Sequence, residues 1–163
     1  MTSLIKVDSI QTAAGGTPTA SSLGIGGVGK IGQIIQGTHS TAFIASGVTS
    51  YADTGLTATI TPTSTSSKIF VMVCHQEGYS NVANSAGHIR LLRDGSQLKE
   101  IVTYQAEQAQ AYLQSMMYNY LDSPSTTSAV TYKTQGKQTA SGGDFRLMSN
   151  GLTHTITLME VLA

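Results

Sequence analysis

Residues 68–74 constrain the fold most, because they form an uninterrupted apolar run of strand length. Ile, Phe, Val, Met, Val and Cys follow Lys68 without a polar residue between them. Both faces of a strand formed here would be apolar, which is typical of a strand with a layer of structure on each side. The run therefore predicts a central strand sandwiched between two layers.

Shorter apolar runs alternate with turn residues after Lys30, and this pattern predicts further strands. Asp94-Gly95 lies between two runs and is a favoured two-residue turn of an antiparallel hairpin. Residues 100–121 carry both a helical and a two-residue spacing, and we favour a loop followed by a strand. The predicted strands cover residues 31–37, 41–49, 54–61, 68–74, 89–93, 97–104, 112–120, 129–135, 145–148 and 153–162.

The composition agrees with a strand-rich chain. The sequence has 22 Thr, 19 Ser and 17 Gly among 163 residues, and these types favour strands and turns over helices. About nine or ten short strands joined by short turns predict an all-β fold, an antiparallel β-sandwich of the jelly-roll type. Its Thr-rich edges would need a cover, which self-association would supply.

The charge content excludes several classes of partner. Only 11% of the residues are charged, and 9 Lys and Arg balance 9 Asp and Glu. A nucleic-acid binder needs a basic face, so we expect no nucleic acid as a partner. No stretch reaches ~18 consecutive apolar residues, so we expect no membrane insertion. Lys6 and Asp8 interrupt the first residues, so we expect no secretory signal peptide.

The N-terminal residues differ in composition from the rest of the chain. Ala, Gly, Thr and Ser dominate residues 11–29, which would bury too little apolar surface to fold alone. We therefore divide the chain into an extended Gly/Thr/Ser-rich arm, residues 1–30, and a β-sandwich domain, residues 31–163. The apolar anchors of the arm would be Leu4, Ile5, Val7 and Ile10.

Two glycine motifs in the arm match the spacing of nucleotide sites. Residues 24–29 fit a dinucleotide fingerprint, and residues 24–30 fit a phosphate-binding loop that ends at Lys30. No strand precedes Gly24, and Ile31 stands where the phosphate loop needs a hydroxyl group. We interpret the glycines as a flexible hinge and expect no cofactor.

The residues that could carry catalysis or bind a metal are scattered. His39, His75, His88 and His154 include no pair at a short ligand spacing. The single cysteine, Cys74, excludes an intrachain disulfide and predicts a small buried side chain. Cys74 and His75 would point to opposite faces of a strand and could not form a catalytic pair. We predict no catalytic residue and no metal site.

Acidic and aromatic residues leave two alternatives open. Glycoside cleavage needs two carboxylates across a cleft, but acidic residues here are expected mostly at turns or strand ends. These residues include Asp53, Asp94, Asp122 and Asp144. Tyrosines in loops over residues 76–86 and 104–112 could stack on host glycans. The candidate glycan contacts are Tyr79, Tyr104 and Tyr112.

Three segments resemble a known family. Residues 4–11, residues 120–129 and residues 156–161 look like small virion proteins of bacteriophages, especially marine and cyanobacterial ones, which are often described as tail fibres. Residues 59–62 and 67–69 fit the same pattern. The resemblance implies a trimeric jelly-roll head, similar to complement and tumour-necrosis-factor-like heads, that the N-terminal arm tethers to the particle.

These observations predict a non-enzymatic virion structural protein on the exterior of the phage tail or capsid. Its partners would be its own copies in a homotrimer, other virion proteins and a host surface glycan. A tail fibre or similar appendage is the leading hypothesis. A capsid decoration or cement protein is the first alternative, because the arm is short for a fibre. A carbohydrate-binding module and a hydrolase are further alternatives.

Overall fold

A computed structural model of the chain describes residues 30–47, 49–80, 85–105, 114–139, 144–147 and 151–163. These residues form strands and turns and include no helix, which confirms the predicted all-β class. The strands are β1 (Ile31–His39), β2 (Phe43–Ser46), β3 (Ala52–Ile60), β4 (Lys68–Ser80), β5 (Ser85–Arg93), β6 (Ser96–Gln105), β7 (Gln114–Asp122), β8 (Val130–Gln138), β9 (Asp144–Leu147) and β10 (His154–Val161).

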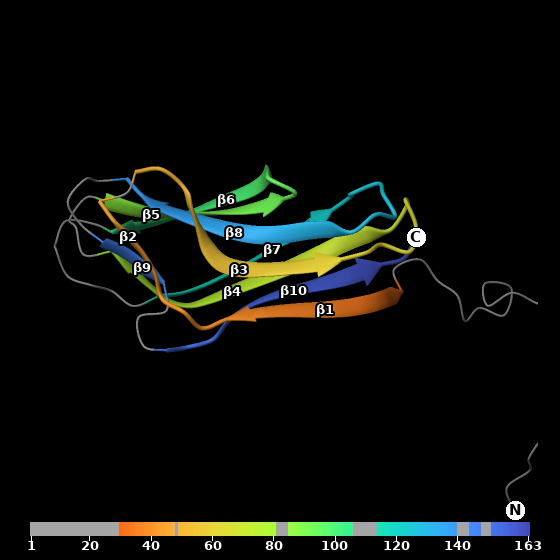
Figure 1. Cartoon of the computed structure of the whole chain (residues 1–163), viewed down its shortest axis with the longest axis horizontal. Coiled ribbons are helices and arrows are strands. Elements are labelled where there is room, and N and C mark those ends of the chain that lie inside the picture. The colour runs from red at the N-terminus through yellow and green to blue at the C-terminus, as the bar shows by residue number, and fades with distance from the viewer. Residues whose placement is uncertain (1–29, 48, 81–84, 106–113, 140–143, 148–150) are drawn as a thin grey trace, which may run out of the picture.

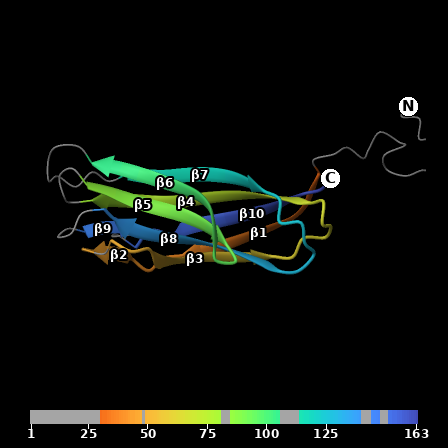
Figure 2. The same ribbon diagram turned by 90° about the horizontal axis from the view of Figure 1, so that it is seen from above.

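The strands form two antiparallel sheets that pack face to face (Figures 1 and 2). Sheet A has the order β1-β10-β4-β9-β2, and β7 also pairs with β4. Sheet B has the order β3-β8-β5-β6. The predicted antiparallel sandwich is confirmed. The element predicted over residues 41–49 is shorter than expected, because only Phe43–Ser46 pair with β9.

The hairpin predicted at Asp94-Gly95 joins β5 to β6. Asp94 has a φ of 47° and Gly95 a φ of 88°, as the two central residues of a type I′ turn require. Arg93 and Ser96 are register partners that close the turn. The Asp94 carboxylate also accepts a hydrogen bond of 2.8 Å from the backbone N–H of Thr131, which ties the turn to β8.

The core between the sheets consists of two clusters of buried apolar side chains. The main cluster contains Leu56, Ala58, Ile60, Ile69, Val71, Val73, Leu91, Val130, Tyr132, Ile156 and Leu158. The end cluster contains Phe43, Ala45, Ile89, Met116, Phe145 and Leu147. The short strands β2 and β9 thus contribute only to the end cluster, at one end of the long axis (Figure 1).

The run at residues 68–74 is a central strand, as predicted, but it is not covered on both faces. Its inward side chains Ile69, Val71 and Val73 are buried. On the other face Met72 is 39% exposed, and Phe70 and Cys74 are only partly buried. Among the described residues no second layer covers this face, which differs from the predicted layer on each side. An apolar pattern shows that a face avoids water, but it does not show whether the same chain covers it.

β1 and β3 approach each other closely at Gly37. A Cβ atom on this residue would lie 2.0 Å from the carbonyl oxygen of Thr57 and 3.1 Å from the Cβ of Ala58. The obstacle is backbone, which cannot rotate away as a side chain can. The missing side chain at Gly37 therefore lets the edge of sheet A pack on sheet B.

Replacing Gly37 with Ala is expected to lower the free energy of unfolding by about 2 kcal/mol or more, because the added methyl group overpacks this contact. Gly32→Ala is the matched control on the same strand. Its added Cβ would meet the Cδ2 atom of Leu162 at 2.9 Å, and that side chain can move. Chemical denaturation compares the two variants. Equal stabilities would contradict the close approach at Gly37.

Candidate interaction surface

The outward side chains in the middle of four neighbouring strands of sheet A form a surface without a charged group, which we call the uncharged face; the exposed Lys68, at the start of β4, lies on the same side beyond its edge. It consists of Ile34, Gln36 and Thr38 of β1, Met159, Thr157 and Thr155 of β10, Phe70, Met72 and Cys74 of β4, and Leu121, Asn119 and Met117 of β7. These residues alternate along each strand with residues that point toward sheet B. The strand period therefore creates both the core and the uncharged face.

One row of the uncharged face is apolar across all four strands. Ile34, Met159, Phe70 and Leu121 are register partners on β1, β10, β4 and β7. Ile34 is 59% exposed and Leu121 is 50% exposed. Contiguous exposed apolar surface is unfavourable in water and is typical of a site that contacts another molecule.

A shallow groove lies beside this row. Met72, Cys74 and Met117 contribute to its lining, together with Asn119 and Thr155, and its volume is about 220 Å³. Cys74 and Met117 are register partners on β4 and β7. Met117 is 77% exposed, so a long flexible side chain stands at the rim of the groove.

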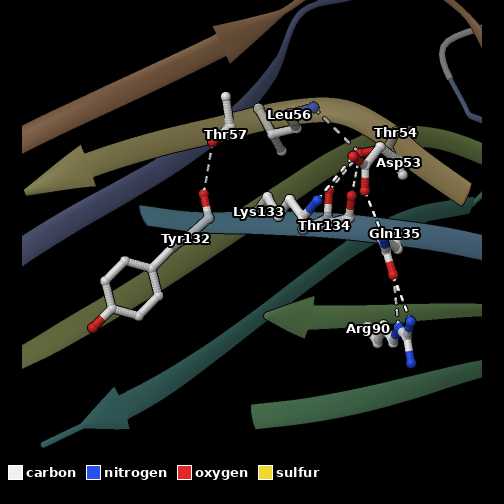
Figure 3. Close-up of polar contacts among 9 residues, drawn as sticks. All are labelled: Asp53, Thr54, Leu56, Thr57, Arg90, Tyr132, Lys133, Thr134 and Gln135. Atoms are coloured by element: carbon white, nitrogen blue, oxygen red, sulfur yellow. Dashed lines mark hydrogen bonds and ion pairs between the residues drawn. The ribbon is translucent and has the colours of Figure 1, made fainter. Parts of the chain in front are cut away.

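The outer face of sheet B has the opposite character. Asp53, Gln135, Arg90 and Glu100 are register partners in one row across β3, β8, β5 and β6. Asp53 accepts hydrogen bonds from Gln135 Nε2 at 2.5 Å and from Lys133 Nζ at 2.9 Å. Arg90 donates to Gln135 Oε1 from Nε at 2.9 Å and from Nη2 at 2.6 Å (Figure 3). A continuous polar network thus crosses this sheet.

Tyr51 and His88 extend the network at Glu100. The Tyr51 hydroxyl donates to Glu100 Oε1 at 2.5 Å, and His88 Nδ1 lies 2.5 Å from the same oxygen. The hydrogen bonds from Tyr51 and His88 lower the pKa of Glu100. The Arg90 guanidinium carbon lies 3.9 Å from the centroid of the Tyr51 ring, which is a cation–π contact.

The two outer faces therefore differ in how favourably they are exposed to water. Exposed ion pairs such as Lys133–Asp53 add little stability, but they make a surface compatible with water. The row of sheet B satisfies its polar groups internally and needs no cover. The uncharged face has no such network and exposes apolar side chains instead.

The four acidic residues singled out in the sequence bind groups of the protein itself. Asp53 binds Lys133, Asp94 binds the backbone of Thr131, Asp122 binds Arg93, and Asp144 binds Arg146. Hydrogen bonds from Lys133 and Gln135 lower the pKa of Asp53, and the contact with Arg146 lowers that of Asp144.

Two of the four histidines come together, although the sequence holds no pair at a short ligand spacing. His75 Nδ1 and His154 Nδ1 lie 2.6 Å apart between the sheets. Sequence spacing could not find this contact, because 79 residues separate the two histidines. The alternation of side chains along β10 could have indicated that His154 is buried, because it places His154 on the same face as Ile156. Cys74 and His75 lie on opposite faces, as predicted.

Predicted site residues lie partly in strands and partly outside the described residues. Tyr79 lies in β4 opposite Arg146, and Tyr104 lies in β6 opposite Ala86. The prediction of a loop at Tyr79 was wrong, because β4 extends further than its apolar run. Tyr104 lies in the strand that was predicted over residues 97–104 and not in the adjoining loop. Outside the described residues lie Tyr112 and the predicted arm anchors Leu4, Ile5, Val7 and Ile10.

The residues that follow the glycine motifs form a strand. Ile31–His39 is β1, so the helix that a nucleotide fingerprint or a phosphate-binding loop requires does not follow Lys30. In the described part of the chain, no three His, Cys, Asp or Glu side chains gather closely enough to hold a metal ion. The same residues provide no helix that could cross a membrane.

No model of a known protein family matches the sequence, and no curated protein matches it either. The surfaces of the fold are therefore the basis for an inference about function.

Glu160 is a fully buried carboxylate close to the start of β1. Gln33 Nε2 donates to it at 2.8 Å, and the backbone N–H and hydroxyl of Thr63 donate at 2.6 and 2.7 Å. Burial raises the pKa of Glu160, but these hydrogen bonds outweigh burial and lower it to about 2. The N–H of Leu162 donates to the Lys30 carbonyl at 2.8 Å. Glu160 thus anchors β10 where residues 1–29 join the sandwich.

Glu160→Gln is expected to lower the free energy of unfolding at pH 7 by about 3 kcal/mol, the equivalent of the lowered pKa. The folded pKa lies below the ordinary 4.5, so the carboxylate stabilises the fold above pH 4.5 and loses this effect as pH falls toward 2. Urea unfolding of both proteins at several pH values measures the difference. A constant difference down to pH 2.5 would contradict the role of the charge.

Proposed function

We propose that this chain is a non-enzymatic structural protein of a bacteriophage virion, a homotrimer that forms the head of a tail fibre or similar appendage. One observation carries the proposal, namely the contrast between the uncharged face of sheet A and the ion-paired face of sheet B. The resemblance of residues 4–11, 120–129 and 156–161 to phage virion proteins supports the same role.

The occupant of the uncharged face in this proposal is a second copy of the chain. Two copies of a surface without charges can meet without repulsion, and its apolar row loses contact with water when they do. Four strands about 4.8 Å apart, each contributing a stretch roughly 17 Å long, span roughly 330 Å² in projection. This area is a little under half of the ~800 Å² that each partner contributes to a standard interface.

Three copies can share this face in a closed ring. Each copy then turns its uncharged face toward the axis and contacts one neighbour near β1 and the other near β7, the strands that flank the face. The charged row of sheet B stays on the outside of the ring, in water. The likeness to trimeric jelly-roll heads supports three copies over two.

The ends of the sandwich suggest how such a head is oriented. β1 begins at the end of the sandwich opposite β2 and β9 (Figure 1), and Lys30 directly precedes it, so the proposal attaches the arm at this end. β2 and β9 lie at the opposite end, where β4 and β6 also end. In the proposal the arm faces the particle. The opposite end, with Tyr79 and Tyr104 near it, faces the host.

Leu121→Lys is expected to convert the trimer into monomers, because it places a charge from each copy in the apolar row. Light scattering should give three times the chain mass for the natural protein and a single chain mass for the variant. The thiol of Cys74 should react faster with a maleimide in the variant, because the uncharged face is then open. Thr59→Lys adds the same charge to an exposed strand position of sheet B and should stay trimeric.

A natural protein that is monomeric at micromolar concentration would contradict the proposed trimer. A Leu121→Lys variant that keeps the natural mass would place the contact between copies on another surface.

Deletion of residues 1–29 is expected to leave a folded trimer that no longer joins the virion. The deletion keeps Lys30, whose carbonyl accepts the hydrogen bond from Leu162. Incorporation is measured by mass spectrometry of purified particles from cells that express either form. Normal incorporation of the shortened chain would refute the docking role of the arm while leaving the trimer intact.

A further inference from the structure

Two fully buried histidines face each other between the sheets. His75 lies on β4 and His154 is the first residue of β10, and neither side chain is exposed. Their Nδ1 atoms are 2.6 Å apart, and the rings meet edge to face with centroids 4.8 Å apart. Nε2 of each ring is also buried and has no hydrogen-bond partner among the described residues.

This geometry fits one shared proton. A neutral imidazole carries a single N–H, so one ring donates through Nδ1 and the other accepts through Nδ1. Uptake of one proton, at the bare Nε2 of the donating ring, would bury a positive charge with no acceptor beside that nitrogen among the described residues. Uptake of a second proton would put hydrogens on both Nδ1 atoms, which are too close to accommodate them. The buried contact between His75 and His154 therefore favours the neutral form of both rings.

The groups around the His75–His154 pair do not offset the cost of burying a positive charge there. His39 on β1 is the register partner of His154, and its charge opposes protonation of that ring. Glu77 on β4 and the backbone of Gln76 favour protonation of His154. Burial outweighs both and lowers the pKa of His154 to about 4. Burial and the neighbouring His154 lower the pKa of His75 to about 3.

The pair lies where sheet A changes its pairing. β4 pairs with β10 as far as Cys74, and it pairs with β9 from Gly78 onward. The register of β4 with β7 shifts between His75 and Gly78, and Glu77 in this bulge has a φ of 59°. On one side of the bulge β4 supplies the main cluster, and on the other side β9 and β2 supply the end cluster.

We infer that the His75–His154 pair is an acid-sensitive latch that keeps the β2–β9 end of the sandwich closed at neutral pH. Protonation buries a charge at the contact between β4 and β10 beside the bulge and so favours its opening. The end cluster holds few side chains and contains the two shortest strands, so it opens before the main cluster. The end that opens is the one opposite Lys30.

The direction of the pH effect follows from the two folded pKa values. Both lie below the ordinary value of 6.5, so the pair stabilises the fold fully above pH 6.5. The stabilisation is lost progressively as pH falls from 6.5 toward 4 and 3. Most carboxylates stay ionised above pH 5, so the window from pH 6.5 to 5.0 isolates the histidines.

Urea unfolding between pH 6.5 and 5.0 tests the latch. The unfolding equilibrium constant of the natural protein should rise by on the order of 100-fold over this window, because unfolding takes up two protons. His75→Gln and His154→Gln should each reduce the rise to on the order of 10-fold. Cys74→Ala changes the neighbouring residue on the other face of β4 and should keep the full rise.

Two further measurements separate a latch from a general loss of stability. Hydrogen exchange at pH 5 should show loss of protection first in β2 and β9, while the pairing of β1 with β10 stays protected. Nitrogen NMR should show that His75 and His154 remain neutral in the folded protein at pH 5.5. Titration of both rings near pH 6.5, or a uniform loss of protection, would overturn the inference.

Discussion

Alternation of side chains along β4 and β10 is the constraint on which the rest of the structure depends. Every second residue of these central strands points toward sheet B, and Val71 and Leu158 are fully buried there. The residues between them, such as Met72 and Thr157, are thereby fixed on the outside. A slip of one residue in register would exchange the two sets. The core and the uncharged face therefore come from the same pairing and cannot vary independently.

The same alternation places polar groups inside the sandwich. Glu160 and His154 share the inward face of β10 with Ile156 and Leu158, and both are fully buried. They occupy the two ends of the strand and meet different partners. Hydrogen-bond donors keep Glu160 charged, whereas burial favours a neutral His154. β10 thus carries the charged Glu160 near Lys30 and the neutral His154 at its other end.

Local signals were sufficient to predict the existence of the strands and the hairpin at Asp94-Gly95. Short apolar runs and turn residues act over a few positions, so a single sequence carries them. The ends of β4 and β5 were missed because pairing with β9 and β8 extends them beyond their apolar runs. The His75–His154 contact and the hydrogen bonds of Glu160 depend on register between distant strands. No local sequence pattern predicts the register between distant strands. The exposure of one face of residues 68–74 also depends on how distant segments pack, so it could not be predicted either.

The hydrogen bond between Leu162 and Lys30 brings the C-terminus to the root of the arm. An affinity tag or fluorescent protein fused after Ala163 would therefore crowd the segment proposed to dock on the particle. In the proposed assembly, a reporter placed there disturbs attachment while it leaves the sandwich intact. Labels for imaging the assembled particle belong on the ion-paired side of sheet B, where water already covers the surface.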